Sequence, residues 1–150
     1  MRTLSILLFS LFVGFTAGAQ SASKVAWKYS AQKISDGKYE VHLTATIQPG
    51  WHLYSQTQSS DAIALPTTIT FTKNPLLSLA GKTEEKGKVF DQFDRATASR
   101  SRYYNGTVDF VQIVQVRGNV TTSVTGEIEF MVCNDEKCLP PDRVKFSVKL

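Results

Sequence analysis

Residues 39–47 read YEVHLTATI, and the strict alternation of apolar and polar side chains in this stretch decides the fold. A period of two is typical of a β-strand that buries one face and exposes the other. The run from Val25 to Ala31 alternates in the same way, and the dipeptide Asp36-Gly37 between the two runs is a turn signal. Together these features predict a β-hairpin at the start of the domain.

Further strand signals follow along the chain. The runs that we expect to form strands are Thr67–Thr72, Lys82–Lys88 as a short edge strand, Gly106–Arg117, Glu127–Cys133 and Arg143–Leu150. The run at 106–117 carries apolar residues on both faces, which predicts a central strand buried on two sides. Trp51 to Tyr54 is a short aromatic segment. Residues 55–62 and 90–105 lack periodicity and predict surface loops, the second of them unusually long.

The chain therefore reads as all-β. No stretch after residue 19 has a convincing helical period. Seven or eight short strands within one domain favour an antiparallel β-sandwich, and we expect it to be immunoglobulin-like.

The first 19 residues have the pattern of a signal peptide. Arg2 supplies a positive start, the apolar run Leu4 to Phe15 follows, and Ala17-Gly18-Ala19 provides the small residues that a signal peptidase requires. We expect export and cleavage after Ala19, which leaves a single domain at residues 20–150. The alternative, a transmembrane anchor, is disfavoured because the apolar run is short and polar chain follows it at once.

Charge and composition exclude some classes of function. The net charge is +4, and the basic residues are dispersed apart from a small cluster at Arg95, Arg100 and Arg102. Without a basic stripe that has interleaved aromatics, we expect no nucleic-acid binding. No second apolar run approaches the length of a membrane span, so we expect no stable membrane insertion after cleavage of the signal.

The two cysteines, Cys133 and Cys138, are the strongest chemical signal. An even number of cysteines in an exported chain predicts a disulfide. Four intervening residues can bring the two Cα atoms within disulfide reach, about 4.4–6.8 Å. Zinc is a poor alternative because only His42 and His52 could complete the ligand set, and their spacing fits no common site. We expect no metal or other cofactor.

Strand parity predicts the direction of Cys133. In an unbroken strand it shares a face with Glu127, Glu129 and Met131, opposite the apolar set Ile128, Phe130 and Val132. Without a bulge, its sulfur faces away from the core and is accessible, as a reactive cysteine must be. A structural staple that contributes about 2 kcal/mol to stability is the other interpretation. Spacing and parity leave both open.

Two sequence segments carry a resemblance to a known family. The run CNDEKCLPPD at 133–142, preceded by EIEFMV, and the stretch PGWHLY at 49–54 resemble the N-terminal periplasmic domain of the thiol:disulfide interchange protein DsbD. The resemblance extends over essentially the whole chain after the signal. It implies an immunoglobulin-like sandwich in the periplasm, in which Cys133 and Cys138 form a redox-active pair. That pair would accept electrons from a thioredoxin-fold donor, fed by a membrane electron-transfer protein, and reduce periplasmic clients.

The resemblance also implies roles for aromatic residues. Trp51 and Tyr54 fall where the family has aromatics beside the disulfide. A cap loop that carries a phenylalanine shields the pair in the family, and residues 90–94, with Phe90 and Phe93, are the candidate here. The resemblance further implies that the sulfur of Cys138 forms the mixed disulfide with a partner. The cysteine spacing is slightly shorter than in the best-known members.

Two hypotheses for function follow. The first is a redox adaptor, a component of a protein-disulfide reductase, whose membrane and thioredoxin-like parts would be separate proteins because this sequence contains neither. The second is a non-enzymatic immunoglobulin-like module for binding or adhesion, with a structural hairpin disulfide. His42 is expected to be solvated on a polar strand face, and His52 to have a packing role beside the aromatic segment.

Overall fold

The computed structural model describes residues 23–95, 98–118 and 120–150, and over these ranges the chain forms β-strands and connecting loops. The strands are β1 (Val25–Ser35), β2 (Lys38–Ile47), β3 (His52–Tyr54), β4 (Thr68–Phe71), β5 (Leu77–Asp94), β6 (Ser99–Val116), β7 (Ser123–Phe130), β8 (Val132–Cys133) and β9 (Asp142–Lys149). The predicted signal peptide, residues 1–19, lies outside the described residues. No helix capable of crossing a membrane occurs in the described ranges.

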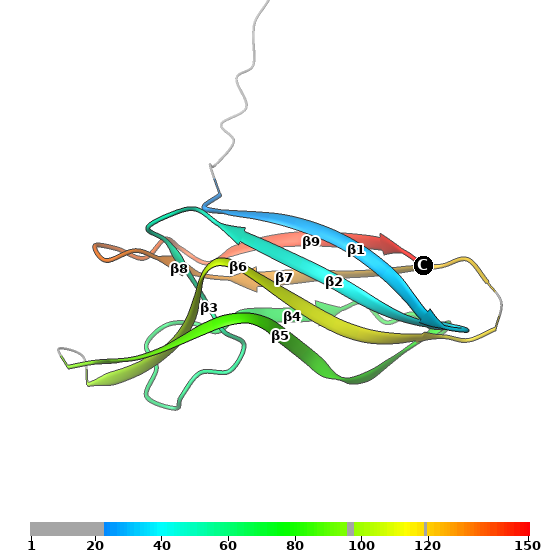
Figure 1. The fold of residues 1–150 in the computed structure, drawn as a ribbon, viewed down its shortest axis with the longest axis horizontal. Coiled ribbons are helices and arrows are strands. Elements are labelled where there is room, and N and C mark those ends of the chain that lie inside the picture. Colours follow the sequence, from blue (N-terminus) through cyan, green and yellow to red (C-terminus); the bar gives the residue numbers. More distant parts are fainter. Residues whose placement is uncertain (1–22, 96–97, 119) are drawn as a thin grey trace, which may run out of the picture.

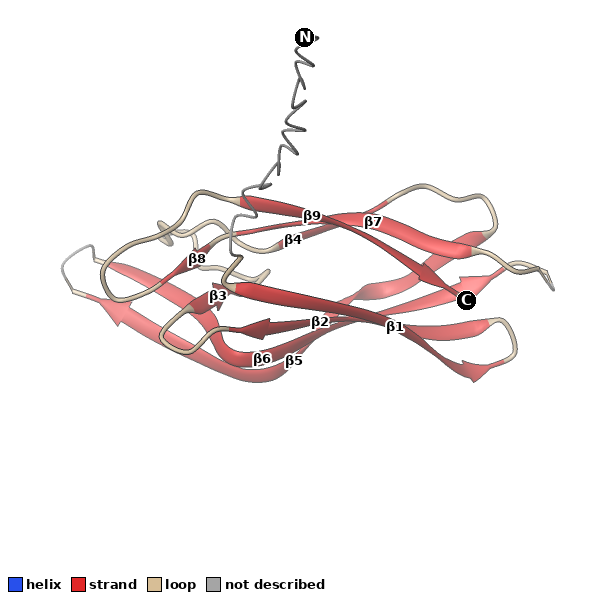
Figure 2. Ribbon diagram, turned by 90° about the horizontal axis from the view of Figure 1, so that it is seen from above, coloured by secondary structure: helices blue, strands red, loops and turns tan. Residues whose placement is uncertain are grey.

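The strands form two antiparallel sheets that face each other (Figures 1 and 2). One sheet has the order β1-β2-β6-β3-β8, with β5 paired to β6, and the other has the order β4-β7-β9. The predicted all-β, immunoglobulin-like antiparallel sandwich is therefore confirmed. The hairpin predicted around Asp36-Gly37 is also present, with Trp27 opposite Ala45 and Tyr29 opposite Leu43.

Strand β6 is central, as its two apolar faces predicted. One of its edges pairs with β5, and the other pairs first with β3, at Tyr103 and Tyr104, and then with β2, from Thr107 onward. Gly106 lies between these two partners with φ of 75°, a conformation that a glycine adopts without steric cost. This change of partner places the short strand β3, which contains most of the aromatic segment 51–54, beside β6.

The core fills the space between the sheets with the alternating apolar residues. Val41, Leu43 and Ala45 of β2 are fully buried, as the pattern of 39–47 predicted. Trp27 packs against Phe110 in its own sheet and Phe130 in the other, with ring centroids 5.9 and 5.4 Å apart. Aromatic contacts across the sandwich thus hold the sheets together by burial of large apolar surfaces.

The predicted loop at residues 90–105 is wrong. Residues up to Asp94 continue β5, and β6 begins at Ser99, so that the two 18-residue strands form one long hairpin. The hairpin extends beyond the sandwich as an arm (Figure 1). An arm of this kind meets solvent on much of its surface, which removes the apolar alternation by which strands are recognised. The predicted edge strand at 82–88 is real but is only the middle of β5.

The run at 127–133 is also not one strand. Strand β7 ends at Phe130 in the three-stranded sheet, and β8, formed by Val132 and Cys133, pairs with β3 in the other sheet. The chain therefore passes from one sheet to the other at Met131. This crossing brings the cysteine segment next to the aromatic segment on β3.

Candidate functional site

Cys133 and Cys138 are joined by a disulfide across a tight loop, as the cysteine count predicted. Their Cα atoms are 4.0 Å apart. The side chain of Asn134 folds the loop by accepting hydrogen bonds from the backbone N–H groups of Glu136 and Lys137, at 3.1 and 2.8 Å. Asparagine favours such local turns because its carboxamide replaces a backbone acceptor. The short loop thus holds both cysteines at one end of the sandwich.

The two cysteines differ in exposure. Cys133 is only 2% exposed, whereas Cys138 is exposed to solvent. Val132 belongs to the main core and Cys133 to a second, smaller cluster, so the prediction that Cys133 faces away from the main core is confirmed. The prediction that it is therefore accessible is wrong. Tyr54 of β3 and Ala64, from the loop of residues 55–67, pack with Cys133 and bury it.

Aromatic side chains on adjacent strands form a wall beside the disulfide. His52 lies directly opposite Cys133 in the pairing of β3 with β8, and Tyr54 lies opposite Tyr103 in the pairing of β3 with β6. The ring of His52 is 4.6 Å from that of Tyr103, and its Nε2 is 3.2 Å from the hydroxyl of Tyr54. Phe90 on the arm stacks on Tyr103, with 5.6 Å between ring centroids and 10° between planes.

A surface pocket joins the disulfide, the aromatic wall and the arm. Its lining includes both cysteines, the aromatic side chains His52, Tyr54 and Tyr103, and the polar residues Gln92 and Asp94 of β5. The cysteine loop and the arm lie at the same end of the molecule (Figures 1 and 2). The exposed Cys138 therefore lies in a pocket that the cysteine loop and the arm both line.

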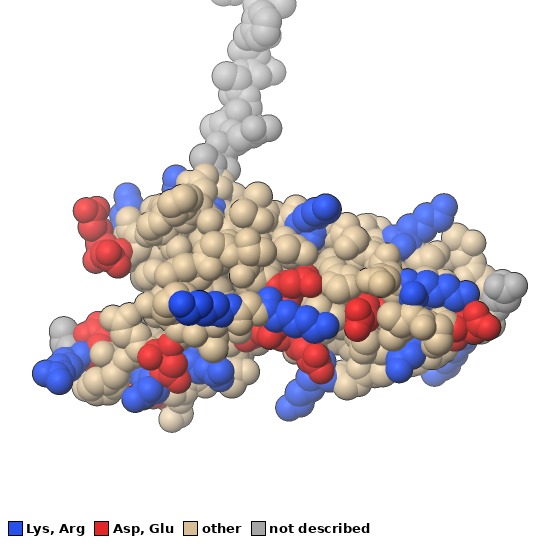
Figure 3. Space-filling view, viewed as in Figure 1, with Lys and Arg blue, Asp and Glu red and all other residues tan. Residues whose placement is uncertain are grey.

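Burial shifts the pKa values of two side chains in the aromatic wall, His52 and Tyr54, in the direction that favours their neutral forms. It lowers the pKa of His52 below its ordinary value, and the negative charge of Asp135 opposes this effect. Burial also raises the pKa of the Tyr54 hydroxyl. Acidic and basic side chains both lie at the end of the molecule where the cysteine loop and the arm lie (Figure 3), and Asp135 and Asp94 line the pocket. The pocket beside the disulfide is thus lined by aromatic side chains and by two carboxylates.

The site residues expected from the sequence do not all meet at the disulfide. Tyr54 lines the pocket, and Phe90 contacts its wall through Tyr103. Trp51 instead packs against the main core, with the ammonium of Lys24 5.5 Å from its ring. Phe93 is half exposed, and its neighbours on β5, not Phe93 itself, line the pocket. The arm thus contributes Gln92 and Asp94 to the pocket, and the loop of residues 55–67 contributes Ala64 to the cluster around Cys133.

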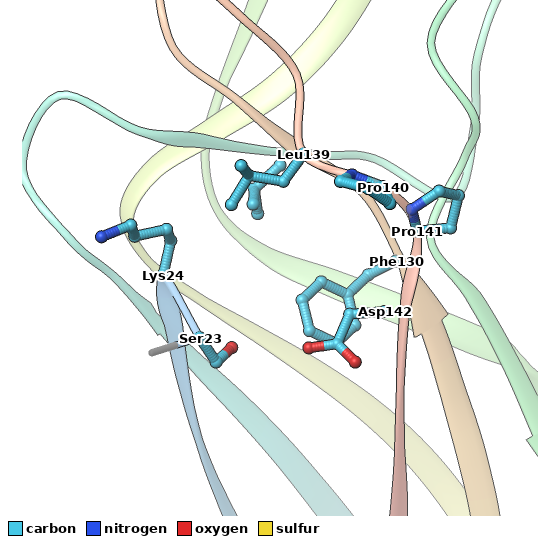
Figure 4. A pocket seen from close by; sticks show the side chains of 8 residues that line it. Ser23, Lys24, Phe130, Leu139, Pro140, Pro141 and Asp142 are labelled. Atoms are coloured by element: carbon cyan, nitrogen blue, oxygen red, sulfur yellow. The ribbon is translucent and has the colours of Figure 1, made fainter. Parts of the chain in front are cut away.

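The segment after Cys138 has a separate environment. Leu139, Pro140 and Pro141 line a second pocket with Phe130, and Ser23 and Lys24 lie across from them (Figure 4). The backbone N–H of Leu139 donates to the carbonyl of Val132 at 2.9 Å. The two prolines thus continue the chain away from the disulfide towards β9.

Two residues of the site were missed from the sequence. Tyr103 lies in the stretch predicted to be a loop, and Ala64 lies in a loop without periodicity. A strand assignment for residues 99–105 would have placed Tyr103 beside Tyr54, whereas no local signal marks Ala64. Within the described residues, no three His, Cys, Asp or Glu side chains come together as they would around a metal ion.

Comparison with known proteins bears on the fold and the family of this chain. No curated protein matches the sequence of this chain. Among solved structures, it is similar to the N-terminal periplasmic domain of ScsB from Proteus mirabilis, with 15% identity and a TM-score of 0.53. That match covers 84% of this chain but only 44% of the ScsB chain, and it supports the fold alone.

A second similar structure is the N-terminal domain of Neisseria meningitidis DsbD in the reduced form, with 15% identity, a TM-score of 0.42 and coverage of 83% of each chain. The family described as "Thiol:disulfide interchange protein DsbD, N-terminal" matches residues 19–150. Because this match covers most of the sequence and includes both cysteines, the chain belongs to the family of DsbD N-terminal domains.

Proposed function

We propose that this protein is a thiol–disulfide exchange adaptor that works through Cys133 and Cys138. It accepts electrons from a thioredoxin-fold donor, itself supplied by a membrane electron-transfer protein, and reduces disulfides of periplasmic clients. The observation that carries the proposal is the exposed Cys138, bonded to a buried Cys133 within an aromatic-lined pocket. A partner can reach one sulfur of this bond while the other is shielded from solvent.

The proposed exchange conserves electrons and protons. A thiolate of the donor attacks Sγ of Cys138, the disulfide breaks, and Cys133 leaves as a thiolate that takes up a proton. The second thiolate of the donor then attacks the mixed disulfide, leaving an oxidised donor and a second thiol at Cys138. In the client reaction Cys138 attacks as thiolate, and Cys133 resolves the mixed disulfide. Two electrons pass at each stage.

The surroundings of the disulfide support this division of roles. Cys133 packs with Ala64 and Tyr54 and is 2% exposed, and this burial would protect its thiol from stray oxidants, to which exposed thiolates are susceptible. Two exposed apolar side chains, Ile63 and Leu65, flank Ala64 in the covering loop, at 69% and 51% exposure. Exposed apolar residues beside a reactive group are suited to contact with a protein partner.

We also propose that the protein is exported. The signal pattern of residues 1–19 supports cleavage after Ala19, and the family to which the chain belongs consists of periplasmic domains. In the periplasm a disulfide persists unless a dedicated donor reduces it, which is the task of the proposed thioredoxin-fold partner.

An exchange assay with purified proteins tests the proposed function. The oxidised chain is mixed with a reduced thioredoxin-fold protein, and free thiols at Cys133 and Cys138 are followed by mass spectrometry after alkylation. The expected result is stoichiometric transfer of two electrons from the thioredoxin-fold protein to the disulfide. A variant carrying Cys133→Ser and Cys138→Ser is the blank. A reduction potential below about −300 mV, together with no transfer, would make the bond a structural one.

One observation favours the alternative of a binding or adhesion module. The low exposure of Cys133 is typical of structural cysteines, which are buried and inert. The same assay separates the alternatives, because a hairpin staple does not exchange with a thioredoxin-fold protein at physiological potentials.

A further inference from the structure

The carboxylate of Glu85 accepts three hydrogen bonds at the start of the loop that covers Cys133. The hydroxyl of Ser55 donates to it at 2.6 Å, the backbone N–H of Gln56 at 2.5 Å and the hydroxyl of Tyr104 at 2.7 Å. Ser55 and Tyr104 are both buried. Glu85 belongs to β5, about thirty residues further along the chain than the loop that it holds.

The loop of residues 55–67 leads directly from Ser55 to the cover over Cys133. Its far end is fixed by the hydroxyl of Thr67, which donates to the carbonyl of Tyr54 at 2.6 Å. Between the two ends, Ala64 packs in the cluster that contains Cys133. Between the ends, the side chain of Gln58 also bonds to both backbone groups of Arg102, and Ser59 and Asp61 bond to the backbone of Arg100. The carboxylate of Glu85 is thus the anchor at the start of a loop that β6 holds further along.

Glu85 is placed for this task by irregularities in β5. The pairing of β5 with β6 shifts register between Ala80 and Glu84 and again between Gly87 and Val89, on either side of Glu85. Such bulges redirect a side chain from its regular position in a strand. A carboxylate is a stronger acceptor than a neutral group, so its loss is costly when buried donors face it.

We propose that Glu85 is a positioning residue that determines which sulfur of the disulfide can be attacked. By holding Ser55 and Gln56, it keeps the loop closed over Cys133 and leaves Cys138 as the reachable sulfur. This inference rests on the proposed exchange function, in which partners form their mixed disulfide at Cys138. Glu85, which lies outside the lining of the disulfide pocket, thus determines whether a partner attacks Cys133 or Cys138.

The test measures the accessibility of Cys133 alone. In a Cys138→Ala background, the rate of alkylation of Cys133 by iodoacetamide is measured under native conditions and compared with the rate in urea. Adding Glu85→Ala should accelerate native alkylation roughly ten- to hundredfold, because three hydrogen bonds to a charged acceptor are lost. Glu85→Gln should accelerate it much less, because the amide oxygen still accepts the N–H of Gln56.

Two controls separate loop opening from a general loss of stability. Glu84→Ala removes the neighbouring, exposed carboxylate and should leave the rate unchanged. Val124→Ala destabilises the buried core in β7 and should lower the free energy of unfolding without faster native alkylation of Cys133. If Glu85→Ala fails to fold, Ser55→Ala and Tyr104→Phe each remove one of the hydrogen bonds and should each give a smaller acceleration.

The outcomes are distinct. Acceleration by Glu85→Ala alone supports the proposal, and partial rescue by glutamine strengthens it. The proposal is overturned if folded Glu85→Ala is alkylated at a rate within about twofold of its Cys138→Ala parent, well below the ten- to hundredfold increase expected from the loss of the hydrogen bonds. It is also overturned if Glu84→Ala accelerates alkylation as much as Glu85→Ala does. Alkylation involves no partner, so failure of the exchange assay with the unmodified chain would overturn the proposed function instead.

Discussion

Cys138 is exposed, whereas Cys133, bonded to it, is 2% exposed and packs with Tyr54 and Ala64. The difference arises because β8 lies beside β3, and Ala64, from the loop that follows β3, packs with Cys133. One cysteine of the bond is therefore exposed to solvent, and the other lies beneath the protein surface. In a relay by thiol–disulfide exchange, this asymmetry defines which sulfur is attacked and which one leaves.

Reduction of the disulfide should lower the free energy of unfolding by about 2 kcal/mol and leave the domain folded. The reason is that the bond closes a very short loop, while the main core between the sheets does not depend on it. Urea unfolding of the oxidised and reduced protein measures the difference. An unfolded reduced protein would show that the bond is an essential staple, which an electron carrier cannot have.

Phe90→Ala should open the aromatic wall and speed reduction of the disulfide by a small thiol. Phe90 stacks on Tyr103, and the loss of an aromatic pair worth about 0.5–1.5 kcal/mol corresponds to a change of roughly two- to tenfold. Phe93→Ala is the matched control, since Phe93 is half exposed and lies opposite Arg100 in the arm, whereas Phe90 lies opposite Tyr103. Pseudo-first-order reduction by dithiothreitol gives the rates. A larger effect of Phe93→Ala would show that the wall is assigned to the wrong phenylalanine.

Stability should depend on pH through His52. Burial lowers its pKa below the ordinary 6.5, against the opposing charge of Asp135. The unfolded chain therefore binds more protons than the folded protein between these two pKa values. The neutral His52 side chain therefore makes its full contribution to the free energy of unfolding above pH 6.5. This contribution is lost as the pH falls through the lower pKa of His52 in the folded protein.

Unfolding in urea across this pH range measures the effect, with His52→Gln as the comparison. The variant should lose less stability than the unmodified protein as the pH falls. Equal pH dependence in the two proteins would mean that the pKa of His52 is not depressed in the folded state.

Ile63→Ser with Leu65→Ser should slow reduction by a thioredoxin-fold donor about fivefold or more, since truncation of interface side chains commonly costs above 1 kcal/mol. Reduction by dithiothreitol should be unchanged, because these exposed side chains do not cover Cys133 themselves. Ile34→Ser with Val120→Ser is the control, as both residues are exposed but lie away from the disulfide pocket. Equal slowing by both pairs would rule out a local docking surface.

The elements that could be predicted from the sequence are those with a local periodic pattern. The β1–β2 hairpin followed from the alternation at 39–47 and the Asp36-Gly37 turn, and both are present. The disulfide followed from the presence of two cysteines. The final strand followed from the strand signal at residues 143–150, and it is present as β9, paired with β7.

The wrong predictions, the accessible Cys133 and the loop at residues 90–105, have a common physical cause. Parity assigned Cys133 to the correct face of its strand, but it carries no information about what covers that face. Ala64, from the loop of residues 55–67, packs with Cys133 on that face, and the start of this loop bonds to Glu85, thirty residues after Ser55 in the chain. The arm of β5 and β6 was missed because solvent on its surface removes the apolar pattern, and with it Tyr103 was missed. The positions of Ala64 and Tyr103 in the site depend on contacts between residues far apart in the sequence, which local patterns do not encode.

Trapping of a mixed disulfide tests the central claim most directly. Cys133→Ala leaves the exposed Cys138 as a free thiol, and Cys138→Ala leaves the buried Cys133. Each variant is incubated with a thioredoxin-fold protein activated at its attacking cysteine, and the adduct is quantified by non-reducing electrophoresis and mass spectrometry. We predict abundant adduct through Cys138 in Cys133→Ala and little in Cys138→Ala. Absence of adduct from both variants would contradict the assignment of this protein as an exchange adaptor.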